Sequence, residues 1–224
     1  MCYNPFGQMR SKTFQVCDLL DSAYGEAKWE RHNPPLEELA LTILSQNTTA
    51  ANCRAAFRNL QERFPTWEMV AQAPVEKIAD AIRTGGLADI KAPRIKAILE
   101  QIGASGSYNL DWLADVSVEE ARRYLEGFPG VGRKTAACVL LFSLGKPVLP
   151  VDTHVYRVAW RVGLISKIGA EKAHDLLADR IPPKRVYSYH INMVRHGRRV
   201  CKARNPRHEE CVLREICDYV QSGT

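Results

Sequence analysis

The residues with the clearest chemical potential lie between Gly127 and Asp152: a glycine-rich turn, a lysine and an aspartate. Lys134 follows the turn and would lie in the first turn of a helix. The positive end of a helix and the adjacent Arg133 both disfavour an ammonium, so Lys134 could act as an amine nucleophile and form a Schiff base with a sugar carbon. Asp152 could stabilise a developing oxocarbenium ion or transfer a proton.

Each of these residues also has an ordinary structural interpretation. Most lysines are solvated or bind a phosphate, and a glycine turn between helices needs no ligand. Asp152 precedes Val155, Val158, Ala159 and Val162, which recur at helical spacing, so it is a good candidate for a helix N-cap. Capping and catalysis are compatible, because a cap lies at the mouth of a helix.

The elements that would position Lys134 form a helix-hairpin-helix. Ser117-Val-Glu-Glu120 has the form of a capping box and predicts a helix to about Leu125. Pro129 ends helical structure, and Gly130 and Gly132 allow backbone angles closed to other residues. The run that follows is rich in helix formers and ends at Gly145. The N–H groups of such a hairpin and of the second helix can bind a phosphate.

Two nucleotide-binding motifs are excluded at the hairpin. A P-loop requires Lys-Ser/Thr directly after its second glycine, where this chain has Arg133. The dinucleotide fingerprint requires a third glycine where Thr135 stands, and no strand precedes the turn.

The remaining chain indicates an all-α protein with an excess of positive charge. It has 224 residues, 31 Lys and Arg against 25 Asp and Glu, and a net charge of +6, which suits a polyanionic partner. Strand-like alternation is almost absent. Helical periodicity instead predicts the following helices: 14–27, 35–44, 53–64, 75–82, a helix after Pro93 that ends at Gly103, 153–162, 169–179 and 188–196.

A cluster of possible metal ligands lies near the C-terminus. Cys201, Cys211 and Cys217 fall within seventeen residues, and His208 lies between the first two. Ligand chemistry alone would favour a Cys₃His zinc site. The cluster abuts a run of six cations, which is either a solvated face or a surface that contacts phosphates: Arg195, Arg198, Arg199, Lys202, Arg204 and Arg207.

The motif LEGFPGVGRKTA followed by VDTH resembles the helix-hairpin-helix, Gly/Pro…Asp superfamily of DNA glycosylases, in its endonuclease III branch. By this resemblance Lys134 is the Schiff-base lysine and Asp152 the essential aspartate. The implied enzyme is a bifunctional DNA glycosylase and AP lyase of base excision repair, which removes oxidised pyrimidines and cleaves the strand by β-elimination. The alternatives are a mismatch- or alkylation-specific glycosylase with weak lyase activity and a non-catalytic DNA-binding module.

The resemblance also implies a two-domain helical fold. One domain is a helical bundle, residues 37–145, that carries the helix-hairpin-helix. The other is assembled from residues 1–36 and 146–224 and carries a C-terminal metal-cluster loop. A DNA groove would run between the domains, with Lys134 and Asp152 facing each other across it.

Residues on both implied domains are expected to contact DNA. Asn47 would fill the gap left by an extruded base, although small amides at a helix junction are usually caps. Leu87, on a glycine loop, would act as a wedge between base steps, or would instead be buried over a helix end. The hairpin and the basic run complete the set: Gly130, Val131, Gly132, Arg133, Arg199, Lys202, Arg204 and Arg207.

The resemblance reverses the order of the metal hypotheses. The family loop has four cysteines, and Cys201, Cys211 and Cys217 match three of them, whereas His208 replaces the second. Because imidazole can replace thiolate on cluster iron, the resemblance implies a [4Fe–4S] cluster with His208 as its fourth ligand. Zinc and a loop without metal are the alternatives. In either metal-bound form the role of the metal is structural, because it holds the basic loop in place.

The expected partner is damaged double-stranded DNA, bound by a monomer. The N-terminal sequence has no apolar segment typical of a signal peptide, and no uninterrupted apolar run is long enough to cross a bilayer. We therefore expect no membrane association and a cytoplasmic, nucleoid-associated protein of a bacterium or archaeon.

Overall fold

The structure, a computed structural model, describes residues 5–178 and 180–222 and divides into two compact units. Unit 1 comprises residues 1–30 and 147–224, and unit 2 comprises residues 31–146. Within the described ranges there are helices and turns but no β-strand, so the prediction of an all-α protein is confirmed. None of the described helices is long and apolar enough to span a bilayer.

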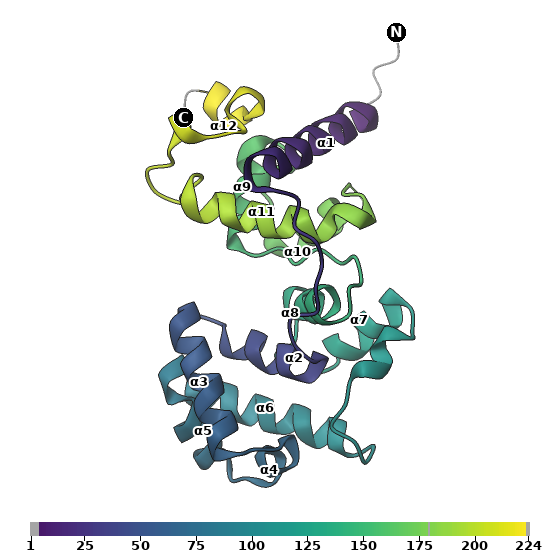
Figure 1. The fold of residues 1–224 in the computed structure, drawn as a ribbon, viewed down its shortest axis with the longest axis vertical. Helices are drawn as coiled ribbons and strands as arrows, with labels where there is room; N and C mark the ends of the chain where they lie inside the picture. The colour runs from purple at the N-terminus through teal and green to yellow at the C-terminus, as the bar shows by residue number, and fades with distance from the viewer. Residues whose placement is uncertain (1–4, 179, 223–224) are drawn as a thin grey trace. The chain divides into compact units, whose positions relative to one another are not determined.

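Unit 2 is a bundle whose helices pack around α6 and α8 (Figure 1). Its elements are α2 (Pro35–Leu44), α3 (Ala50–Arg63), α4 (Trp67–Gln72), α5 (Val75–Ile82), η1 (Arg83–Gly85), α6 (Ala88–Gly103), η2 (Asp111–Ala114), α7 (Val118–Glu126), α8 (Arg133–Cys138) and η3 (Val139–Ser143). The apolar positions predicted from helical spacing form its core; Leu39, Leu60, Ile78 and Ile98 are all at most 2% exposed.

Three details of unit 2 differ from the prediction. Helix α4 was not predicted; it begins because the Thr66 hydroxyl accepts the Met69 N–H. Helix α6 begins at Ala88 rather than after Pro93, since a proline inside a helix removes one backbone donor without ending the helix. The helix that follows the hairpin turns into a π-helix at Val139.

Unit 1 joins the N-terminal helix to the C-terminal part of the chain, residues 147–224. Its elements are α1 (Pro5–Tyr24), α9 (Thr153–Val162), α10 (Ala170–Ala178), η4 (Pro183–Arg185), α11 (Val186–Arg199), η5 (His208–Glu210), η6 (Arg214–Ile216) and α12 (Asp218–Gln221). Helix α11 packs against both α1 and α9 (Figure 1). Asp179, the predicted end of the helix that corresponds to α10, lies outside the described residues.

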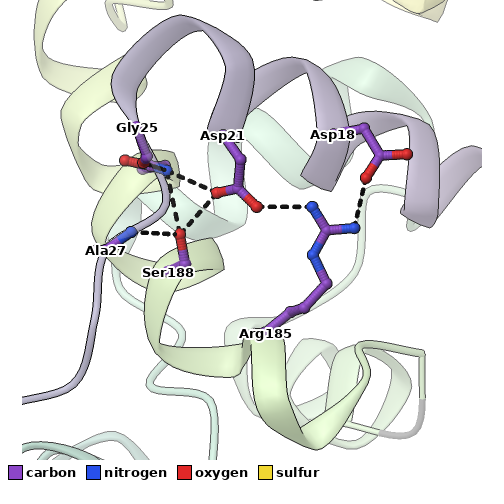
Figure 2. A network of polar contacts seen from close by, with 7 residues as sticks. Asp18, Asp21, Gly25, Ala27, Arg185 and Ser188 are labelled. Carbon is purple, nitrogen blue, oxygen red and sulfur yellow. Dashed lines mark hydrogen bonds and ion pairs between the residues drawn. The ribbon is translucent and has the colours of Figure 1, made fainter.

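A polar network ties α1 to α11 (Figure 2). The Arg185 guanidinium lies between Asp18 and Asp21, at 2.5 and 2.6 Å from their carboxylate oxygens. Ser188 donates to Asp21 and accepts the backbone N–H of Ala27. Because Asp21 is largely shielded from solvent, these charge-assisted bonds hold the N-terminal helix on the start of α11.

Candidate functional site

The turn between α7 and α8 is a tight hairpin. The Ser117 hydroxyl accepts the Glu120 N–H at 3.1 Å and starts α7, as the capping-box pattern predicts. At the turn, Gly130 has φ +75°, and the Val131 N–H donates to the Phe128 carbonyl at 3.1 Å. Only glycine adopts that φ without strain, so the need for glycine at position 130 is confirmed.

Gly132 behaves differently from the prediction. Its φ of −99° and ψ of −178° are extended angles open to any residue, so the prediction of unusual backbone angles there is wrong. A Cβ built on Gly132 would meet nothing within 4 Å. The residue is exposed at the start of α8, and the helix has no side-chain cap. The start of α8 is therefore not closed by a side chain of its N-cap residue.

Lys134 is the second residue of α8 and is partly buried. The hairpin thus places it in the first helical turn, as predicted. Burial raises the pKa of the Cys53 thiol on α3, and Lys91 and Lys134 are among the cations that oppose this shift. Helix α2 packs against both α8, which carries Lys134, and α3, the helix that follows the loop carrying Asn47.

Asp152 is the N-cap of α9. One carboxylate oxygen, Oδ1, accepts the backbone N–H groups of His154 at 2.9 Å and Val155 at 2.8 Å. The structural role predicted for Asp152 is thus confirmed. Because both bonds use the same oxygen, capping leaves Oδ2 available to another partner, so a second role for the carboxylate is compatible with its cap.

His154, in the first turn of α9, packs against Gly197 of α11. His154 Nδ1 lies 3.0 Å from Arg157 Nη2, and a Cβ on Gly197 would approach the His154 Cβ to 2.9 Å. Glycine at 197 is therefore required for α9 and α11 to approach this closely. Burial lowers the pKa of His154, so its imidazole favours the neutral form.

Two exposed loop residues of unit 2 are the predicted DNA-inserting side chains. Asn47 and Leu87 both have φ +52°, in the left-handed region that non-glycine residues rarely adopt. Leu87 is 46% exposed, so the alternative in which it is buried over a helix end is wrong. Ile90, one helical turn later, is 47% exposed and was missed by the sequence analysis; its i+3 spacing from Leu87 was the available signal.

The C-terminal cysteines line one cavity of unit 1. Cys201, His208, Cys211 and Cys217 surround about 250 Å³ of empty space, counting the part open to solvent. Among the described residues, no three His, Cys, Asp or Glu side chains lie at metal-binding distance from a common point. The donor set nevertheless fits an iron–sulfur cluster or zinc in chemical type, because three thiols and one imidazole face the same cavity.

Arg161 organises the loop around this cavity. It is 7% exposed and donates to the carbonyls of Lys202 at 2.7 Å and Ala203 at 3.1 Å. Its Nη1 lies 3.4 Å from Cys201 Sγ, while its own carbonyl accepts from Cys217 Sγ at 3.3 Å. The buried guanidinium of Arg161 therefore holds the start of the cysteine loop on α9, and the backbone carbonyl of the same residue holds its end.

His196 is a further residue that the sequence analysis missed. It is 1% exposed; its Nε2 lies 3.5 Å from Cys211 Sγ and its Nδ1 2.9 Å from the Tyr24 hydroxyl. Burial lowers the pKa of His196 to about 4, so the imidazole is neutral at physiological pH. The available signal was its position, five residues before Cys201, the first cysteine of the C-terminal loop.

The basic run is only partly available to a ligand. Arg199 and Arg204 are exposed and Lys202 is partly buried. Arg207 forms an ion pair with Glu210 at 3.2 Å, and Arg195 donates to the Tyr24 carbonyl at 2.7 Å. Two of the six cations are thus engaged within the protein, and the exposed ones remain candidates for phosphate contacts.

Comparison with known proteins identifies the class. The family described as "HhH-GPD superfamily base excision DNA repair protein" matches residues 40–183, and the "Iron-sulfur binding domain of endonuclease III" matches residues 201–217. The "Putative DNA glycosylase" of Arabidopsis thaliana is 38% identical over 81% of this chain, which spans 62% of that relative's length. Endonuclease III of Thermotoga maritima is 33% identical over 84% of this chain and 85% of its own.

A solved structure agrees with these matches. The protein in "Structure of a non-covalent Endonuclease III-DNA Complex" superposes with a TM-score of 0.81 at 28% identity, covering 96% of this chain and 97% of that one. An all-helical DNA glycosylase fold with a hairpin followed by a lysine is thus present. The chain belongs to the HhH-GPD superfamily of base excision DNA repair proteins, among its endonuclease III-like members, and is a DNA glycosylase with an iron–sulfur-type C-terminal loop.

Proposed function

We propose that this chain is a bifunctional DNA glycosylase and AP lyase that removes oxidised pyrimidines from double-stranded DNA. The observation that carries the proposal is the position of Lys134, in the first turn of the helix that follows the hairpin. An amine in that place has a clear use in a glycosylase that forms a covalent intermediate. The retained lysine and aspartate argue against a pure binding module, which needs neither.

In the proposed reaction Lys134 Nζ attacks the anomeric carbon of a flipped nucleotide, and the bond from that carbon to the base breaks with its electron pair going to the base. Asp152 stabilises the positive charge that develops on the sugar through the oxygen its cap does not use. Ring opening gives a protonated Schiff base on Lys134. Loss of a proton from the adjacent sugar carbon then expels the 3′ phosphate.

The same proposal assigns the DNA contacts. Hairpin N–H groups at Gly130 to Arg133 bind a phosphate, and Asn47 and Leu87 enter the base stack where the damaged nucleotide leaves it. The exposed part of the basic run, with Arg199, Lys202 and Arg204, contacts the backbone, and Arg207 joins it once its pair with Glu210 opens. The protein acts as a monomer on genomic DNA.

The assay for this function uses four duplexes that carry thymine glycol, 5-hydroxycytosine, a T:G mismatch or 3-methyladenine. We expect base release from the first two, with strand cleavage that needs no added alkali. The proposal would be contradicted if only the mismatched or the alkylated base were released and the strand were cleaved only when alkali was added. That result would support the specialised glycosylase. Binding without release from any duplex would indicate a non-catalytic module.

We further propose that Cys201, His208, Cys211 and Cys217 hold a [4Fe–4S] cluster. All four line the cavity of unit 1, and the loop matches the iron–sulfur domain. The cluster would act structurally by fixing the loop, so that the cations on it contact phosphates without an additional ordering cost. Arg161 and His196, which contact the cysteine sulfurs, would donate to or shield the bound thiolates.

His208 is tested by metal content and absorbance rather than by activity. We expect about four irons per chain and a broad absorbance band at about 400 nm in the purified protein. His208→Ala should lose most of the iron, and His208→Cys should keep it with a changed spectrum. Glu209→Ala, a change in the same short turn, is the control and should match the wild type. One zinc per chain, or full iron content in His208→Ala, would overturn the assignment.

A further inference from the structure

Lys91 is a buried lysine that ties two loops of unit 2 together. It lies in the second turn of α6 and is 1% exposed. Its ammonium donates to the Leu44 carbonyl at 2.7 Å and to the Gly85 carbonyl at 2.9 Å. Burial lowers the pKa of this lysine. A buried ammonium is destabilising unless it is hydrogen-bonded, so the bonds to these two carbonyls offset the cost of burying Lys91.

The two acceptors belong to the stems of the two loops that carry the exposed left-handed residues. Leu44 is the last residue of α2 and precedes Asn47 by three positions; Gly85 ends η1 and precedes Leu87 by two. Both carbonyls lie at helix ends, where intrahelical donors are lacking. The ammonium therefore supplies the missing donor to both stems at once and sets the distance between them.

Close packing supports the same arrangement. A Cβ built on Gly85 would lie 3.0 Å from the Ala56 Cβ and 4.0 Å from the Leu44 carbonyl oxygen. The η1 stem thus packs tightly against α3, and a methyl group at residue 85 would require a shift of a few tenths of an ångström there. Since interiors are close-packed, a change at this junction must shift the loops relative to each other.

We propose that Lys91 is a positioning residue that sets the spacing of Asn47 and Leu87, so that both side chains enter the same place in a DNA base stack. This inference rests on the proposed function, because it takes the two loops as DNA-inserting elements. The inference also assigns Ile90 to the apolar wedge, because Ile90 is exposed on the same helical face as Leu87. Lys91 touches neither the DNA nor the reacting atoms; it acts through the backbone of both loops.

Helix α6 contains a matched control. Lys96, five residues later, also donates to two backbone carbonyls, those of Ala71 and Ala73 (3.1 Å to Ala73). These carbonyls belong to the end of α4, so Lys96 pins a different part of unit 2. Lys96 is partly buried and also pairs with Glu100 at 3.3 Å, so its substitution removes two lysine–carbonyl bonds and one ion pair without touching either loop stem.

The experiment compares Lys91→Met with Lys96→Met, because methionine keeps an unbranched chain of similar length and removes the donors. Three quantities are measured: thermal unfolding, single-turnover release of an oxidised pyrimidine, and borohydride trapping on DNA with a preformed abasic site. Both variants should lose thermal stability. Only Lys91→Met should slow base release, by about tenfold or more, as small displacements of positioning groups do. Trapping on the abasic site, where no base must be displaced, should change much less.

Two further measurements distinguish a positioning role of Lys91 from a purely structural one. A 2-aminopurine beside the lesion should show a smaller increase in fluorescence with Lys91→Met than with Lys96→Met. If Lys91→Met does not fold, Gly85→Ala tests the same spacing, since its methyl group would lie 3.0 Å from the Ala56 Cβ and require a shift of a few tenths of an ångström between the loop and α3. We expect slow release with normal trapping. Equal release by Lys91→Met and Lys96→Met, or unchanged release by a folded Gly85→Ala, would overturn the inference. Absence of release and trapping in the wild type would instead contradict the proposed function.

Discussion

Lys134→Gln should abolish covalent trapping to abasic DNA under borohydride and should slow release of an oxidised base by about 1,000-fold or more, because the nucleophile is lost. Glutamine is polar and one atom shorter than lysine, and it has no basic amine. Lys134 is partly buried at the helix start, so the substitution should leave the packing of α8 intact. The measurements are trapped yield on gels and single-turnover release.

The control for Lys134→Gln is Lys77→Gln, which removes one exposed positive charge from α5 of the same unit. Both variants should bind duplex DNA with similar affinity in fluorescence anisotropy at matched salt, since each loses one cation. A trapped yield for Lys134→Gln equal to that of Lys77→Gln would refute Lys134 as the Schiff-base residue. Loss of DNA binding in Lys134→Gln alone would reduce its role to a phosphate contact.

Asp152→Asn should slow base release by about 100-fold or more while leaving the protein folded, because it removes the charge that stabilises the sugar cation. Asparagine is as good an N-cap as aspartate, and its Oδ1 can accept the same N–H groups of His154 and Val155. The free energy of unfolding should therefore change by less than about 0.5 kcal/mol. DNA affinity should be equal or slightly higher, since a negative charge is lost.

Asp152→Ala separates the two roles of this residue. It removes the cap as well as the charge, so it should cost about 1 kcal/mol of stability in addition to the catalytic effect. Urea unfolding measures the first effect and single-turnover release the second. Full activity in Asp152→Asn would leave Asp152 with the cap alone, and equal stability of the Asn and Ala variants would contradict the capping account.

Local rules were sufficient for the parts of the site that depend on neighbouring residues. The capping box at Ser117, the left-handed glycine at 130, the start of α9 at Thr153 and the cap by Asp152 follow from interactions within four residues, so the amino-acid pattern alone indicates them. The same holds for the core faces of α2 and α5, whose apolar spacing is helical.

Local rules were insufficient where two weak signals compete. Pro93 was taken to exclude the preceding residues from α6, yet the helix begins at Ala88, because packing against α4 and α5 outweighs the loss of one backbone hydrogen bond. Helix α4 has only six residues, too few for a periodic signal, and its stability comes from contact with α6.

The amino-acid sequence by itself determined the class of this protein: a basic, all-helical chain with a hairpin, a lysine, a capping aspartate and a cysteine loop, each readable from short-range spacing. Only the tertiary structure decided that Leu87 is exposed, that Lys91 bonds to Leu44 and Gly85, and that His196 contacts Cys211. The reason is physical: exposure and long-range hydrogen bonds depend on which segments pack together, and for Lys91 one acceptor lies 47 residues away in the chain.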